Sequence, residues 1–425
     1  MVNKKVRLAK RRAAASRAQL CVALLAFQRG LILVTLMLVV MVMLKRLGMS
    51  NSWASCSTAF LILPYVARPV LRPILARLPF HGWCLIVMQV GASVALWFAA
   101  GSMEPQGGGV EMWLLLSVAA IVGACHDVLA EDFGMSLYGS RRPGRLLVGV
   151  SMLVLSIVIG LGVTLMAAGD MEVMLRNVRQ AWQTALKIPA GVMFAVAVLS
   201  AMVLPGAKHF GSVDSPTKWR FVARRWWSMP RQWVFASFVL LMAFQEVLVA
   251  KGLLMFVVDP GSSGGLSLGP HEAAFAYGTS GGFMMLLGLV LGYLSVRRCG
   301  LRRWAWPMVA SAVLPDAVLL YLAYFMPSDF MVVCLCLAVE CFGCGFALAG
   351  LVLYLRYYGY GRGNAGYWHS CLALVALSAS VAGVVTGFIQ DYFGYRMFFL
   401  MVIVTGLLAA FSVAMLRLVR VRRQA

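Results

Sequence analysis

Long apolar runs are the feature that most constrains this chain. Runs of about eighteen or more residues with few charges recur along the sequence, and about twenty helical residues cross the roughly 30 Å hydrocarbon core of a bilayer. Hydrophobic residues make up 62% of the chain and charged residues only 12%, whereas about 25% of the residues of an ordinary soluble domain are charged. We therefore expect the chain to fold within a lipid bilayer.

Charged or Pro- and Gly-rich breaks divide the apolar sequence into twelve runs. The runs cover residues 19–44, 53–76, 83–101, 111–136, 146–168, 188–205, 233–258, 271–296, 304–326, 329–355, 365–389 and 397–416. Their length and lack of alternation exclude the short strands of a membrane β-barrel. The sequence predicts an all-α integral membrane protein with about twelve transmembrane helices. It also predicts a short interfacial helix within residues 170–187, where charged and apolar residues alternate.

The basic residues are distributed unevenly between the loops. The net charge of +22 raises the question of nucleic-acid binding, but the 37 Lys and Arg residues are scattered over several loops rather than gathered in one patch. If the N-terminus is cytoplasmic, most of them lie in the terminal segments and loops on that side, as the positive-inside rule requires. We therefore expect a multi-pass protein with both termini cytoplasmic and no nucleic-acid partner.

The longest basic interruption divides the chain into two equal sets of six runs. It covers residues 206–232 and contains two prolines as well as several basic residues. The sequence thus predicts an N-terminal six-helix half over 1–205, a basic cytoplasmic central loop over 206–232, and a C-terminal six-helix half over 233–425. Glycine pairs at four-residue spacing predict close packing of the eighth and eleventh helices, namely Gly278 with Gly282, Gly288 with Gly292, and Gly383 with Gly387.

Two groups of charges lie within the apolar runs of the N-terminal half. A charge at the membrane centre costs at least about 2.5–3.5 kcal/mol on insertion scales, so each one indicates a functional site. Arg29 is expected to face a cavity, an acidic partner or an anionic substrate, with snorkelling to the surface as the alternative. Asp127 and Glu131 share one helix face, where one of them should hold a proton, and His126 is placed to relay it. Asp132 lies nearer the helix end, where solvation is the simpler interpretation.

The C-terminal half carries further intramembrane polar residues. Glu246 and Lys251 point about 140° apart on one helix, so they should not neutralise each other. Lys251 is a candidate to bind a substrate carboxylate or an acid of another helix. Glu340 joins Asp127, Glu131, His126 and Glu246 as a candidate for proton coupling, whereas Gln245 and Asp316 join Arg29 and Lys251 as candidates for substrate binding.

Short motifs recur along nearly the whole chain in a spacing typical of one family. They are His126-Asp127 with Glu131, Glu246 with Lys251 and Asp259, Tyr277-Gly278-Thr279, Trp306-Pro307, the run from Glu340 to Phe346, and the runs 387–391 and 394–399. Together they resemble the muropeptide permeases of the major facilitator superfamily, especially those of Bacteroides-like bacteria. The resemblance implies the major facilitator fold and proton-driven import of anhydromuropeptides, which are sugar-peptide products of cell-wall turnover, across a bacterial inner membrane for recycling.

Three positions depart from the family pattern. Arg29 stands where the family has an acidic residue, Ile32 where it has a proline, and Ala76 where the superfamily's gating motif has an aspartate. A change of charge beside a binding cavity can change the sign of the substrate that is favoured.

Other functions remain as alternatives to muropeptide import. They are a proton-coupled carrier or exporter of another amphipathic anion, such as a peptide or siderophore, and a receptor or scaffold that does not transport. No nucleophile motif, nucleotide-binding motif or metal-spaced cluster stands out. We therefore expect no enzyme activity, metal or cofactor, a proton gradient as the energy source, and a monomer whose partners are protons, a small molecule and the lipid bilayer.

Overall fold

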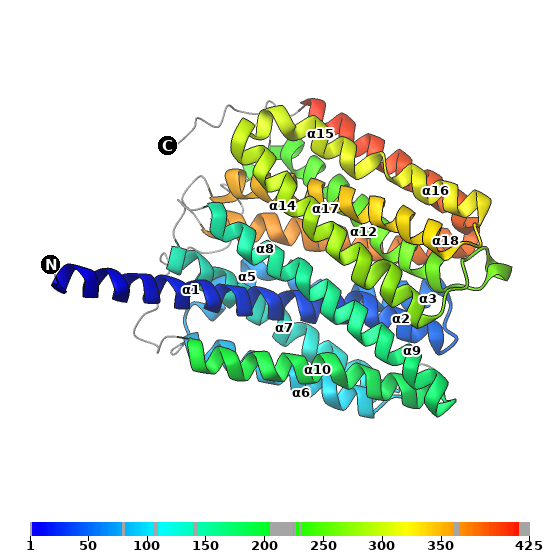
Figure 1. Ribbon diagram of the computed structural model, residues 1–425, viewed down its shortest axis with the longest axis horizontal. Helices are drawn as coiled ribbons and strands as arrows, with labels where there is room; N and C mark the ends of the chain where they lie inside the picture. Colours follow the sequence, from blue (N-terminus) through cyan, green and yellow to red (C-terminus); the bar gives the residue numbers. More distant parts are fainter. Residues whose placement is uncertain are drawn as a thin grey trace.

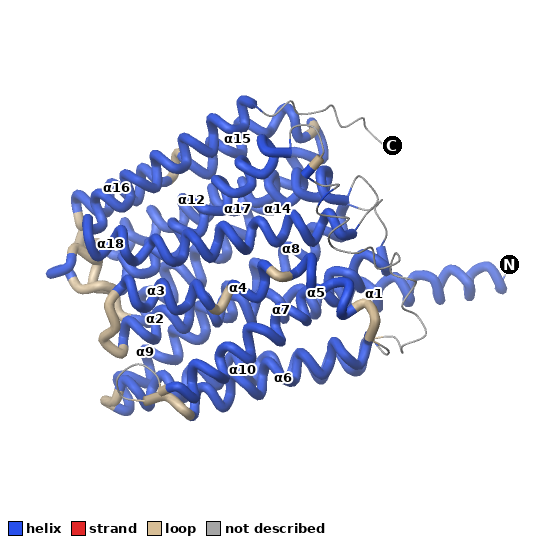
Figure 2. The backbone as a smooth tube through the Cα atoms, turned by 180° about the vertical axis from the view of Figure 1, so that it is seen from behind, coloured by secondary structure: helices blue, strands red, loops and turns tan. Residues whose placement is uncertain are grey.

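The computed structural model is a bundle of long helices that run side by side (Figure 1). It describes residues 2–78, 81–104, 109–138, 143–204, 224, 227–228, 232–360 and 365–415. These described residues contain helices and no strand (Figure 2). The central loop expected over 206–232 lies almost entirely outside them, so the exact boundaries of the two halves remain a prediction.

Six membrane crossings make up the N-terminal half. The first consists of α1 (Val2–Val34), the π-helical segment η1 (Thr35–Val39) and α2 (Val40–Arg46). The second is bent and consists of α3 (Asn51–Phe60), α4 (Leu63–Val66) and α5 (Arg68–Leu75). The remaining four are α6 (His81–Gly101), α7 (Val110–Tyr138), α8 (Pro143–Ile157) with η2 (Val158–Val163) and α9 (Thr164–Leu175), and α10 (Val178–Val203).

The C-terminal half begins with α12 (Gln232–Val258), which is followed by the short η4 (Gly261–Ser263). The next crossing joins α13 (Pro270–Ala273), η5 (Ala274–Gly281) and α14 (Gly282–Cys299). Then come α15 (Leu301–Val313) with α16 (Asp316–Phe325), α17 (Phe330–Tyr360), and α18 (Ala365–Met415). The two halves lie beside each other along the bundle in both views (Figures 1 and 2).

The prediction of twelve crossings is confirmed once two breaks are taken into account. Within the described residues, ten helices are long and apolar enough to cross a membrane, and the bent helix of α3 to α5 makes an eleventh. The longest of the ten, α18, has a non-helical residue at Gly394, where φ is 74°. This break separates the last two crossings. The described residues therefore begin at Val2 and end at Met415 on the same side of the bundle (Figure 1).

The prediction of an interfacial helix within residues 170–187 is wrong. Instead, α9 continues to Leu175 and α10 begins at Val178, with a left-handed Arg176 (φ 49°) at the turn between them. Polar side chains of this segment bind neighbouring helices rather than lipid headgroups. Arg46 forms an ion pair with Glu172, and Arg179 Nε donates to the carbonyl oxygen of Met103 at 2.7 Å. The alternating charges therefore belong to the ends of two crossing helices.

The glycine pairs do mark close helix packing, as the sequence predicts. A Cβ added at Gly278 would lie 2.6 Å from Cα of Gly162, so η5 of one half rests on η2 of the other. A Cβ at Gly292 would lie 2.7 Å from the carbonyl oxygen of Phe346 on α17, and one at Gly383 would lie 2.8 Å from Cβ of Ala59 on α3. The two halves are thus in direct contact along two seams, η2 with η5 and α3 with α18.

Candidate functional site: charged clusters around a cavity between the halves

Arg29 binds both carboxylates that the sequence places on one face of α7. Its Nε donates to Asp127 and its Nη1 donates to Glu131. Arg68 of α5 forms a second ion pair with Asp127, which is 1% exposed. Two arginines thus compensate two carboxylates, so the argument that one of the carboxylates must hold a proton no longer applies to this cluster in its present arrangement. The expectation that Arg29 faces an acidic partner is confirmed.

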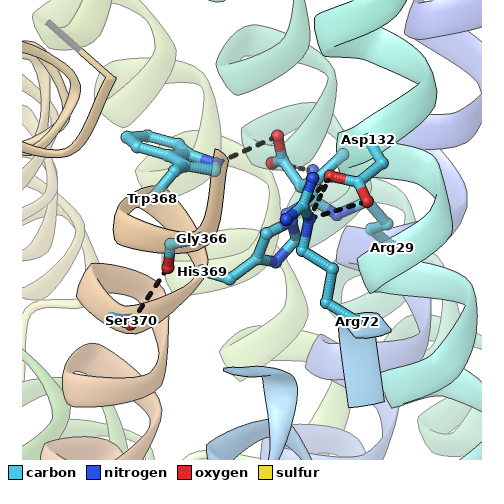
Figure 3. Close-up of polar contacts among 8 residues, drawn as sticks. Arg29, Arg72, Asp132, Gly366, Trp368, His369 and Ser370 are labelled. Carbon is cyan, nitrogen blue, oxygen red and sulfur yellow. Dashed lines mark hydrogen bonds and ion pairs between the residues drawn. The ribbon is translucent and has the colours of Figure 1, made fainter. Parts of the chain in front are cut away.

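A second ion-pair cluster lies one residue further along α7 and joins the two halves (Figure 3). Arg72 Nε donates to Asp132 Oδ2 at 3.0 Å, and His369 Nε2 of α18 lies 3.0 Å from Asp132 Oδ1. The expectation that Asp132 is solvated is wrong, because this side chain is only 7% exposed. Beside it, Trp368 Nε1 donates to Glu131 Oε2 at 3.3 Å.

A cavity of about 280 Å³ lies between the halves next to these clusters. Arg29 and Glu131 line it from the N-terminal half, and Trp368 and Arg356 line it from the C-terminal half. Most of the other lining residues are apolar and belong to α1, α7, α8, α17 and α18. They come from the parts of these helices nearest the N-terminus and the predicted basic loops. The cavity therefore lies toward the basic end of the bundle.

A hydrogen-bonded network joins the halves at the opposite end. Asp259 at the end of α12 is 2% exposed and forms an ion pair with Lys45 of α2 at 2.9 Å. Its Oδ2 accepts hydrogen bonds of 2.6 Å from Asn51 Nδ2 and from the hydroxyl of Tyr395. Asn51 also donates to Gln390 of α18. We call these five residues the Asp259 latch; they join the halves at the end of the bundle that lies away from the cavity.

The polar residues predicted in the C-terminal half form a third group. Gln245 Nε2 donates to Asp316 Oδ2 at 2.9 Å, and both side chains are fully buried. Asp316 interacts electrostatically with Glu340 and Glu246, and Glu340 accepts a hydrogen bond from Cys344 Sγ at 3.3 Å. Within the described residues, none of these three carboxylates forms a salt bridge. We call Glu246, Asp316 and Glu340 the acid group.

In the described part of the chain, the hydrogen-bond partners of Lys251 and His126 are not the carboxylates with which the sequence associates them. Lys251 is fully buried, and its Nζ donates to the carbonyl oxygen of Ser55 and to Thr58 Oγ1, both at 2.8 Å. It thus crosses from α12 to α3 instead of facing the cavity. As predicted, it does not pair with Glu246. His126 Nε2 lies 3.3 Å from Gln89 Nε2 on α6.

Several residues of these clusters are absent from the sequence-based candidates. Arg68 and Arg72 lie inside the predicted run 53–76, and both are buried. Their four-residue spacing places them on one helix face, and this is the signal that could have identified them. Nothing in the sequence pairs His369 with Asp132, because their helices are far apart in the chain.

The arrangement of helices is similar to that of known structures, although no family model matches this chain and no curated protein matches it significantly. The nucleoside transporter NupG aligns over 95% of this chain and 100% of its own, with a TM-score of 0.66 and 15% identity. A bacterial homolog of the human lysosomal transporter Spinster, inward-facing and unoccupied, aligns over 95% of this chain and 96% of its own, with a TM-score of 0.68 and 13% identity.

The chain has the major facilitator fold. At these levels of identity the comparison concerns the fold alone. The cavity beside Arg29 lies between the two six-helix halves of this chain, and the Asp259 latch lies at the end of the bundle farther from it.

Proposed function

We propose that this protein is a secondary transporter that exposes one cavity to the two sides of a membrane in turn. The observation that carries the proposal is the position of the cavity. It lies between the halves at the basic end, whereas the Asp259 latch joins the halves at the other end. If the basic end is cytoplasmic, as the positive-inside rule indicates, this is an inward-open arrangement in a bacterial inner membrane. The transporters NupG and the Spinster homolog, which share the fold, support this proposal.

The acid group supports coupling to protons. Several uncompensated carboxylates held close together in low dielectric cannot all ionise at low cost. Glu246, Asp316 and Glu340 interact electrostatically with one another and form no salt bridge in the described part of the chain. We therefore propose that at least one of them carries a proton in this conformation. A proton gradient supplies energy if protonation and substrate together favour the same conformation.

The lining of the cavity supports an amphipathic anion as substrate. Its walls are mostly leucine, valine and alanine, while Arg29 and Arg356 supply positive charge and Trp368 supplies an aromatic face. An anhydromuropeptide combines a sugar with an acidic peptide and belongs to this class. Together with the sequence motifs, this makes proton-driven import of anhydromuropeptides the preferred function. Another peptide or a siderophore is the alternative within the same class, and export is the alternative direction.

Uptake into proteoliposomes tests the proposal. Labelled anhydromuropeptide should accumulate in oriented vesicles under an inward proton gradient and should only equilibrate without one. Glu246→Gln should lose the gradient-driven accumulation but keep exchange of labelled for unlabelled substrate, because the cavity is unchanged. Glu111→Gln, at an exposed position at the start of α7, is the control and should behave as the wild type.

Each alternative has its own result. Accumulation of another peptide or a siderophore in place of the muropeptide would keep the transporter and change the substrate. Saturable binding without uptake under any gradient would indicate a receptor. Equal accumulation by Glu246→Gln and the wild type would contradict the proposed role of Glu246.

A further inference from the structure

The two carboxylates that share Arg29 have different surroundings. Asp127 is 1% exposed and is held by Arg68 as well as by Arg29. Glu131 has 19% of its side chain exposed, lines the cavity, and has Arg29 as its only cationic partner among the described salt bridges. A ligand that enters the cavity therefore meets Glu131 and the outer part of the Arg29 guanidinium, whereas Asp127 lies behind them. Glu131 is the carboxylate that a ligand can replace.

Glu131 also connects the two halves of the molecule. One of its oxygens accepts a hydrogen bond from Arg29 on α1, and the other accepts one from Trp368 Nε1 on α18 at 3.3 Å. Trp368 lines the cavity beside Arg29 and Glu131. Any ligand group that moves Glu131 away from Arg29 also moves the acceptor of the Trp368 hydrogen bond. Occupation of Arg29 and contact between the halves are thus linked through one side chain.

The charges around Glu131 limit how an anion can enter. Arg29 of α1, Arg68 of α5 and His369 of α18 interact electrostatically with Glu131, and Arg356 of α17 lines the same cavity. On α7 itself, Asp127 shares Arg29 with Glu131, and Asp132 is the next residue in the chain. The lining residues from α8 carry no charge. Arg29 and Arg68 already balance Asp127 and Glu131. A buried charge that loses its partner is strongly destabilising, so an ionised Glu131 cannot simply be displaced by a second anion.

We propose that a carboxylate of the ligand binds Arg29 in place of Glu131, and that Glu131 takes up one proton from the cavity as it is displaced. Arg29 Nη1 then donates to a ligand oxygen, Glu131 becomes a neutral carboxylic acid, and the net charge of the cluster is unchanged. The hydrogen bond from Trp368 is lost in the same step. The inference rests on the proposed transporter function, because it assigns the cavity as the substrate site.

Calorimetry on the full chain in lipid nanodiscs tests this exchange. The probe is N-acetyl-leucyl-leucine, an amphipathic peptide carboxylate, and its C-terminal amide is the neutral counterpart. Titrations in buffers with different ionisation enthalpies give the number of protons taken up. The acid should bind with uptake of about one proton, and its affinity should rise as the pH falls. The amide should bind at least about tenfold more weakly, because it lacks the charge-assisted hydrogen bond to Arg29.

The variant Glu131→Gln distinguishes replacement of Glu131 by the ligand carboxylate from binding of the ligand without that replacement. It should bind the acid about tenfold more tightly than the wild type, since Arg29 no longer has to release a carboxylate, and proton uptake should disappear. The matched control is Glu172→Gln. Glu172 likewise binds an arginine and a tryptophan, Arg46 and Trp182, but does not line the cavity. This control should bind the acid with the same affinity and proton uptake as the wild type.

Several results would overturn the inference. They are equal binding of the acid and the amide, binding of the acid without proton uptake, unchanged proton uptake in Glu131→Gln, and no binding of the acid to the folded wild type. Failure of the proposed function looks different. If the acid binds with linked proton uptake but no substrate accumulates in vesicles, the exchange stands and the transporter proposal falls.

Discussion

At the scale of single residues, the N-terminal clusters are balanced ion pairs between distant parts of the chain. Arg29 and Arg68 share Asp127, Arg29 also holds Glu131, and Arg72 holds Asp132. Burial of such charges is tolerated only while every partner is present, because removal of one partner leaves another charge uncompensated in low dielectric. The clusters should therefore respond more strongly to single substitutions than to paired ones.

Arg29→Gln is expected to destabilise the protein by about 3–5 kcal/mol near neutral pH, the range for breaking a buried ion pair. Asp127 keeps Arg68 as its partner, so most of the loss comes from Glu131. The loss should shrink as the pH is lowered, because a protonated Glu131 needs no cation, and the double variant with Glu131→Gln should recover part of it. Thermal unfolding in detergent measures the effect. Equal stability of Arg29→Gln and Arg17→Gln, a change at an exposed position, would contradict the prediction.

The sequence could predict those members of the site that one helix supplies by itself. Asp127 and Glu131 are recognisable because a four-residue spacing places them on one face, and Arg29 because it interrupts an apolar run. The partners supplied by other helices were missed. His369 and Trp368 lie more than 230 positions away from their acceptors Asp132 and Glu131, and no local pattern encodes such a pairing.

At the scale of elements, a buried polar network joins the halves at the end away from the cavity. There, α2 and α3 of one half meet the end of α12 and the middle of α18 of the other through the Asp259 latch. Asp259 accepts hydrogen bonds from Asn51 and Tyr395 and forms an ion pair with Lys45. We expect the latch to hold that end closed, and its removal should favour the conformation that opens there.

Asp259→Asn tests the latch. The substitution keeps the size of the side chain but removes the charge that binds Lys45, and hydrogen bonds to charged groups are worth about 1.5–3 kcal/mol each. The population opened at that end should therefore rise by about tenfold or more. Spin labels can be attached to cysteines that replace Trp53 and Tyr392, which are exposed and lie on different halves, in an otherwise cysteine-free background. Double electron–electron resonance should then report a longer distance between the two labels. Asp170→Asn, at an exposed position near the same end, should leave the distance unchanged.

The sequence also predicted most of the elements, because each crossing is one apolar run of sufficient length. It did not predict the ends of α9 and α10. There the helices continue past the apolar core and present polar side chains such as Glu172 and Arg179 to neighbouring helices. A hydropathy pattern indicates which residues lie in the hydrocarbon core of the bilayer, and it does not indicate where a helix ends beyond that core. The ends of α9 and α10 therefore differ from the prediction.

At the scale of the whole molecule, the predicted distribution of basic residues and the position of the cavity distinguish the same two ends of the bundle. The described start of α1, the described end of α18 and the cavity lie at one end of the bundle, and the Asp259 latch lies at the other (Figure 1). The basic residues of the sequence are predicted to lie at the first end, and we propose from the positive-inside rule that this end is cytoplasmic. A measurement of which end of the bundle faces the cytoplasm therefore also gives the side of the membrane toward which the cavity lies.

Cysteine labelling of intact cells measures this orientation. Ser263→Cys, at the exposed turn of η4, should react with a membrane-impermeant maleimide added from outside, because it lies at the latch end. The native Cys299 is exposed at the end of α14, at the opposite end of the bundle. It should react only after the cells are permeabilised. The reverse pattern would contradict the assignment of the basic end to the cytoplasm.

The π-helical segments have a consequence for comparing this chain with its evolutionary relatives. In a π-helix each hydrogen bond spans one residue more than in an α-helix, so η1, η2 and η5 each place an additional residue inside a membrane crossing. Deletion of one residue from η5 would restore a regular helix and leave the residues of α14 facing the same neighbours, because the wider π-helical turn accommodates the additional residue. Gaps of a single position in an alignment can therefore fall in the middle of a crossing. Loops, where gaps are usually placed, are not the only positions at which the length of this fold can change.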